Sequence, residues 1–151
     1  LGAIPLDVQL LIDGWREHLG VEVTVRQLNP DAYFYQLADQ VDNLFDYGWI
    51  ADYPDPENFL DVLLHSEAKD SNIGGYSNRA YDRLLEAARS EPDTAVRMRL
   101  YNDAEQLLLD DAGIIPLYHG PDYVLTKPHV EGFVVGPLGI PLLQNVTIRP
   151  R

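Results

Sequence analysis

The sequence contains no cysteine. Disulfide bridges, thiolate nucleophiles and cysteine-based metal sites are therefore excluded. Basic residues are also scarce, because 11 Lys and Arg stand against 24 Asp and Glu, a formal net charge of −13. Contacts to phosphate need clusters of positive charge, so this balance argues against nucleic acid and anionic membrane surfaces as partners.

Long apolar runs are missing too. No run approaches the roughly 20 residues that a helix needs to cross a bilayer. The opening LGAIPLDVQL has neither an initiator Met nor the basic start of a secretory signal, which predicts a cut end such as that of a mature form or a fragment. A length of 151 residues with 46% hydrophobic residues suits one ordinary globular domain.

Signatures of catalysis and of metal binding are absent from the sequence. No serine lies in a nucleophile-elbow pattern, and Gly74-Gly75 lacks the lysine that follows in a phosphate-binding loop. The histidines have no metal-like mutual spacing, at positions His18, His65, His119 and His129. The sequence therefore predicts no catalytic residue, no metal and no cofactor.

Helical and strand-like patterns alternate along the chain. Spacing of apolar residues and cap residues predicts helices over 4–19, 30–38 and 57–65, then a helix capped by Ser77 or Asn78, and another that begins at 90–93 and is ended by Gly113. Alternating or short apolar runs predict strands over 21–28, 43–50 and 114–119, and glycine and proline predict short strands and turns from Gly120 onward. The order favours an α/β fold, or an α+β fold with a mixed sheet and flanking helices.

The stretch GWIADYPDPENFL, residues 48–60, carries the most informative chemistry. Asp52 lies where a predicted strand meets Pro54, with Trp49 and Tyr53 beside it. A carboxylate among aromatic rings is well suited to hold an ammonium group by ion pairing and cation–π attraction. Tyr76, after Gly74-Gly75, either lines a cleft or packs on the neighbouring helix.

Asp55 leaves two interpretations open. With Asp52 it could form the carboxylate pair of a hydrolase such as a glycosidase, which requires two groups that face a substrate with separated pKa values. Alternatively Asp55, directly before Pro56, caps the helix that follows. The spacing favours the cap, and an enzyme is not expected.

The tail GPLGIPLLQNVTIRP, residues 136–150, is apolar and ends in the strand-like NVTIR. We expect this strand to need a sheet edge that the chain itself does not supply. The tail would then be disordered or would pair with a neighbouring molecule, a form of self-association. A third reading of the protein is thus an interaction module whose tail docks on a partner chain.

Four blocks of the sequence, in order, resemble the C-terminal part of bacterial extracellular solute-binding proteins, the family of oligopeptide and dipeptide receptors of ABC importers. The blocks are HLGVEVTV, GWIADYPDPENFL, NIGGYSNRAYDRLLEAA with RMRLYNDAEQLLLDDAGIIPLYH, and VLTKPHVEGF. The resemblance covers essentially the whole chain, and members of this family are several times longer.

The resemblance implies a portion of the C-terminal lobe of a two-lobed periplasmic-binding-protein-like fold. Residues 1–126 would form the lobe core, and residues 127–151 would pair with the missing N-terminal lobe. In peptide-binding members the Asp of the Trp-x-Ala-Asp-Tyr block pairs with the ammonium group of the ligand, so Asp52 takes that role here and Trp49 lines the same cleft. Expected partners are a peptide or similar small solute and an ABC permease, at a periplasmic or extracellular, transporter-associated location.

Overall fold

The structure is a computed structural model, and it describes residues 3–39, 42–118, 120 and 123–150. The chain divides into two compact units, Leu1–Phe45 and Asp46–Arg151. The sequence-based division between residues 126 and 127 separates a lobe core from a tail that would pair with a missing lobe. It stays a prediction.

The first unit is helical. Helix α1, Leu6–Leu19, buries Ile12 and ends at Gly20, whose left-handed backbone (φ 66°) donates its N–H to the carbonyl of Arg16. A left-handed glycine is the common end of a helix, so the predicted helix and its end are confirmed. A 3-10 turn, η1 (Pro30–Ala32), leads into α2 (Tyr33–Asp39), which confirms the short helix predicted there.

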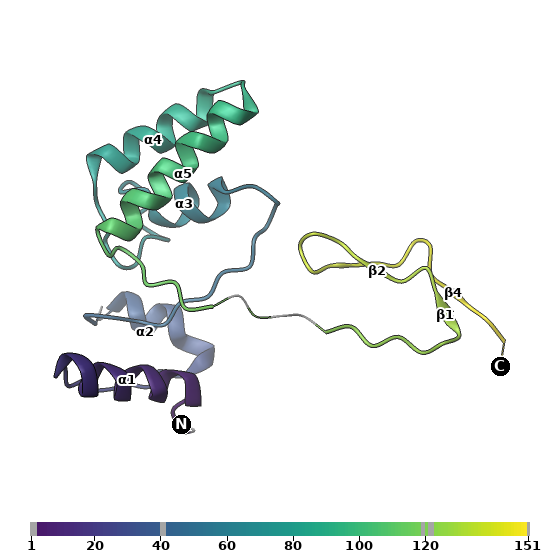
Figure 1. Ribbon diagram of the computed structural model, residues 1–151, viewed down its shortest axis with the longest axis horizontal. Helices are drawn as coiled ribbons and strands as arrows, with labels where there is room; N and C mark the ends of the chain where they lie inside the picture. The colour runs from purple at the N-terminus through teal and green to yellow at the C-terminus, as the bar shows by residue number, and fades with distance from the viewer. Residues whose placement is uncertain (1–2, 40–41, 119, 121–122, 151) are drawn as a thin grey trace. The chain divides into compact units, whose positions relative to one another are not determined.

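The second unit is built on three helices that pack together, α3 (Glu57–Leu64), α4 (Arg79–Ser90) and α5 (Thr94–Asp110) (Figure 1). Their common hydrophobic core consists of Leu60, Tyr81, Leu85, Ala88, Tyr101, Ala104 and Leu108. Each large apolar side chain buried there contributes about 1.5–3 kcal/mol. This core keeps the helices at fixed positions relative to the loop before α3.

Polar contacts define where these helices begin. The Asn78 side chain accepts the N–H of Ala80 at 2.8 Å, and the Asp93 side chain accepts the N–H of Val96 at 2.9 Å. Each such cap stabilises a helix start by about 1 kcal/mol. The sequence left Ser77 and Asn78 open as caps of α4, and the structure selects Asn78.

The tail forms two small antiparallel sheets. Strand β1 (Val130–Glu131) pairs with β4 (Thr147–Ile148), and β2 (Val134–Val135) pairs with β3 (Pro141–Leu142) (Figure 1). Gly132 has φ 73°, and a Cβ on it would lie 2.1 Å from the carbonyl oxygen of Asn145. Only glycine fits the turn that brings these strands together.

The tail corrects one expectation. The strand predicted in NVTIR is present as β4, but its partner is β1 of the same chain. The expectation that it lacks a sheet edge is therefore wrong. The prediction of self-association through the tail depended on an unpaired strand, and β4 is paired with β1.

Three predicted strands are also wrong. Residues 21–28, 43–50 and 114–118 have no strand, and His119, the last residue of the third, lies outside the described residues. In these segments Val21, Ile50 and Ile115 are exposed. An alternating pattern favours an extended chain, but a strand also requires a second strand beside it.

Candidate functional site

The loop from Trp49 to Asn58 is organised around one buried side chain. Asn58, in the first turn of α3, is 1% exposed. Its Oδ1 accepts the indole N–H of Trp49 at 2.9 Å and the backbone N–H of Asp52 at 3.0 Å. Its Nδ2 donates to Oδ2 of Asp52 at 3.3 Å. One amide thus joins the indole ring and the carboxylate that the sequence singled out.

Asp52 itself is exposed to solvent. In the part of the chain that the structure describes, no Lys, Arg or His forms an ion pair with its carboxylate. The carboxylate is held from one side by a neutral amide, and no cationic side chain among the described residues neutralises it. This is the arrangement that an incoming cation can use.

The two aromatic residues of the predicted site are half exposed. Trp49 stacks parallel to Tyr47, with ring centroids 6.5 Å apart. The Tyr53 hydroxyl donates to Oε2 of Glu57 at 2.6 Å, and this hydrogen bond raises the pKa of Tyr53. Trp49 and Tyr53 stand on either side of Asp52 in the sequence, and the indole bonds to the same Asn58 side chain as Asp52 does.

Asp55 has a structural role. Its Oδ1 accepts the backbone N–H of Glu57 at 3.0 Å, which confirms that it caps α3. Both of its oxygens also accept hydrogen bonds from Arg97 of α5, at 2.7 and 2.8 Å. Hydrogen bonds from Arg97 hold the pKa of Asp55 below its ordinary value, against the opposing effect of burial. A carboxylate held in this ionised pair is not a proton donor for hydrolysis.

Tyr76 packs inside the helical unit. Its ring meets that of Tyr81 edge to face at 5.2 Å, and its hydroxyl donates to Oδ2 of Asp111 at 2.8 Å. Burial and this hydrogen bond raise the pKa of Tyr76 to about 12. The packing alternative stated for Tyr76 matches this placement, and a role in ligand binding stays a prediction.

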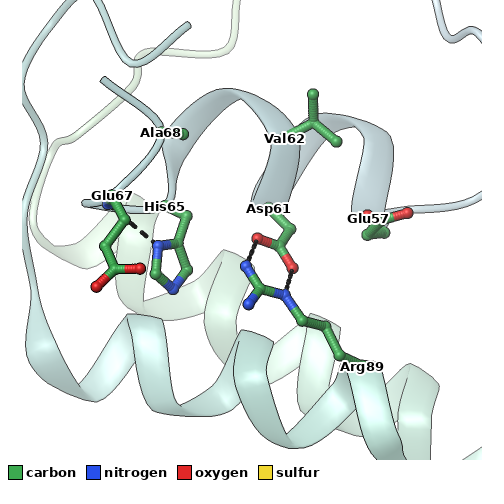
Figure 2. A pocket seen from close by; sticks show the side chains of 7 residues that line it. All are labelled: Glu57, Asp61, Val62, His65, Glu67, Ala68 and Arg89. Carbon is green, nitrogen blue, oxygen red and sulfur yellow. Dashed lines mark hydrogen bonds and ion pairs between the residues drawn. The ribbon is translucent and has the colours of Figure 1, made fainter. Parts of the chain in front are cut away.

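A separate hollow of 380 Å³ lies along α3 (Figure 2), and its lining residues are Glu57, Asp61, Val62, His65, Glu67, Ala68 and Arg89. Asp61, 4% exposed, is already paired with Arg89 at 2.5 and 2.6 Å, and Figure 2 shows the two groups facing each other. Neither Asp52 nor Trp49 lines this hollow.

His65 illustrates why histidine positions alone did not indicate a site. It is 3% exposed, and its Nδ1 accepts the backbone N–H of Glu67 at 3.1 Å (Figure 2). Within the described residues, no group of three or more His, Cys, Asp and Glu side chains is placed to hold a metal ion. The same residues include no helix with both the length and the apolarity that a bilayer crossing requires.

Sequence reasoning missed two residues that hold the loop, Asn58 and Arg97. Asn58 carried a signal, because asparagine is a poor helix former and, near a helix start, often bonds to nearby backbone. Arg97 lies 42 residues from Asp55 along the chain. No local pattern in the sequence pairs residues at that separation.

Comparisons with known proteins agree with this architecture. No protein-family model matches the chain. The probable deoxycholate-binding periplasmic protein YgiS of Escherichia coli is 34% identical over 119 residues, which cover 79% of this chain and 22% of that protein. The periplasmic oligopeptide-binding protein OppA of Salmonella typhimurium is 30% identical over 135 residues, covering 89% and 24%. The solved structure of a dipeptide-binding protein from Pseudoalteromonas sp. SM9913 in complex with Met-Leu matches with a TM-score of 0.76 and 26% identity, over 94% of this chain and 28% of that one.

The chain belongs to the oligopeptide/dipeptide-binding family of bacterial extracellular solute-binding proteins. It spans about a quarter of the length of the relatives that it matches, which are periplasmic binding proteins rather than enzymes. Its helices and small antiparallel sheets form an α+β portion of the periplasmic-binding-protein fold.

Proposed function

We propose that this chain is the part of an ABC-importer substrate-binding protein that holds the ammonium end of a peptide or similar small solute. The observation that carries this proposal is Asp52, an exposed carboxylate with no ion-pair partner in the described part of the chain, held beside the Trp49 indole. A carboxylate next to an aromatic ring attracts a primary ammonium group by ion pairing and by the ring quadrupole.

The net negative charge of the protein at neutral pH supports a cationic rather than an anionic ligand group. With a formal net charge of −13, the surface repels anions and raises the local concentration of cations. The ligand would be delivered to a membrane permease from a periplasmic or extracellular position. In the full-length protein, a second lobe would cover the ligand and exclude water from the ion pair.

The names of the relatives give different ligands. The proposal is therefore limited to the binding of an ammonium group and does not name the ligand. OppA is named for oligopeptides, whereas YgiS is named for deoxycholate, which has no amine. The hydrolase alternative is not supported, because Asp55 is engaged by Arg97 and by the start of α3. The alternative of an interaction module depended on an unpaired tail strand, and that strand, β4, is paired with β1.

The test is calorimetry on the wild-type full-length protein with alanine peptides of increasing length, each with a free or an acetylated N-terminus. The free peptides are expected to bind at least about tenfold more tightly than their acetylated forms, because acetylation removes the charge that Asp52 binds. Equal affinity for the two forms, or no binding of any peptide, would refute the proposal.

A further inference from the structure

The side-chain amide of Asn58 bonds to the two residues that define the proposed site. Its Oδ1 receives two N–H groups, from the indole of Trp49 and the backbone of Asp52, at 2.9 and 3.0 Å. Its Nδ2 reaches back to the carboxylate of Asp52 at 3.3 Å. We propose that Asn58 is the positioning residue of this site, which sets the indole and the carboxylate at one fixed separation.

The chemistry of this position selects asparagine. The site needs an acceptor for two N–H groups and a donor for a carboxylate, and one neutral amide supplies both. Aspartate offers the acceptor but no donor, and it places a second negative charge beside Asp52. Alanine leaves the indole N–H and the Asp52 N–H without their acceptor.

Burial makes the arrangement rigid. Asn58 is 1% exposed, and the helix that carries it is fixed to the core by its neighbour Leu60. The Leu60 carbonyl also accepts the buried hydroxyl of Tyr81 at 2.7 Å. A polar side chain held this way cannot rotate freely, so the groups bonded to it are held too. A fixed carboxylate loses less conformational entropy when it pairs with a ligand.

This inference rests on the proposed ammonium site, and one comparison separates the two. The quantity to measure is the preference for a free over an acetylated N-terminus, with trialanine and N-acetyl-trialanine as probes of the full-length protein. Asn58→Ala is expected to reduce this preference about tenfold, the loss of about one hydrogen bond to a charged group. Tyr81→Phe is the matched control, since it removes another buried hydrogen bond of α3 away from Asp52, and it is expected to keep the preference.

A second readout needs no ligand. The indole N–H resonance of Trp49, assigned with Trp49→Phe, is expected to shift and to exchange faster with solvent in Asn58→Ala. Asn58→Asp keeps the acceptor and is expected to leave the indole N–H close to its wild-type position. If Asn58→Ala fails to fold, the position of the indole N–H in Asn58→Asp remains as the test.

The outcomes are distinct. A wild type with no preference for the free N-terminus overturns the proposed function and, with it, the binding role of Asn58. A wild type with the preference, retained in Asn58→Ala, overturns the positioning role alone. An indole N–H that is unchanged in Asn58→Ala, or that moves as far in Asn58→Asp, also overturns it.

Discussion

Asp55 and Arg97 meet through two hydrogen bonds of 2.7 and 2.8 Å, although 42 residues separate them in the sequence. Arg97 also donates to the Tyr101 hydroxyl at 2.9 Å, and its guanidinium lies 4.7 Å from the centroid of that ring. The pair ties the loop that carries Asp52 to the longest helix of the chain.

Removing Arg97 should therefore destabilise the protein. Arg97→Ala leaves the partly buried Asp55 carboxylate without its cation and is expected to lower the free energy of unfolding by about 1–3 kcal/mol. Arg99→Ala, on an exposed position of the same helix, is the control and should change it by less than about 0.5 kcal/mol. Urea unfolding of the full-length variants measures both, and equal effects would contradict the role of the pair.

The same pair predicts a pH dependence. Hydrogen bonds from Arg97 lower the pKa of Asp55 in the folded state below the unfolded value of about 3.9. The stabilisation is therefore present above that unfolded value and is lost as the pH falls through the folded value. Asp55→Asn should be less stable than wild type at neutral pH, and the difference should shrink below about pH 4.

The control for this dependence is the Arg97→Ala background, in which the Asp55 carboxylate has lost its partner. There the stability difference made by Asp55→Asn should vary much less with acid pH. Urea unfolding at a series of pH values measures both differences. A difference that varies equally in the two backgrounds would show that Arg97 is not the cause.

Two glycines should respond to alanine with opposite signs. A Cβ on Gly113 would lie 2.6 Å from Cδ1 of Leu108 and 2.8 Å from Cδ2 of Tyr76, so Gly113→Ala should cost about 1–3 kcal/mol. Gly14, inside α1, has no atom within 4 Å of its Cβ position, so Gly14→Ala should stabilise by about 0.5–1 kcal/mol. Calorimetric melting temperatures measure both, and a stabilising Gly113→Ala would contradict the close packing of Tyr76.

Tyr76 should titrate at unusually high pH. Burial and the hydrogen bond to Asp111 raise its pKa to about 12, which tyrosine ring-carbon NMR can follow. Asp111→Asn should lower this pKa, because the carboxylate disfavours the phenolate. Asp110→Asn, at the adjacent position, should leave it unchanged. Equal effects of both variants would mean that the Tyr76–Asp111 hydrogen bond does not set the pKa.

The helices could be predicted from the sequence because their signals are local. Apolar spacing and caps placed α4 and α5, and Asn78 and Asp93 cap them as such residues do in most helices. Tyr101 of α5 is 1% exposed and belongs to the buried core that these helices share. The three wrong strands failed because the identity of a strand depends on a partner that lies elsewhere.

The sequence indicates the chemistry of the candidate site, which stays a prediction, but not the contacts that hold the loop. Asp52 and Trp49 stand out as a carboxylate and an indole in one short loop, and the structure joins them through Asn58. The ion pair between Asp55 and Arg97 is a tertiary contact, which neither the spacing nor the composition of the loop contains.

The affinity of the full-length Asp52→Asn variant for trialanine tests the central claim most directly. Asp52→Asn keeps the size and the polarity of the side chain and removes the charge, so it should weaken binding of trialanine about tenfold or more and leave N-acetyl-trialanine unaffected. Asp103→Asn, at an exposed position of α5, is the control for the overall charge and should bind as the wild type does. If Asp52→Asn binds trialanine within about twofold of the wild type, the Asp52 carboxylate does not hold the ligand.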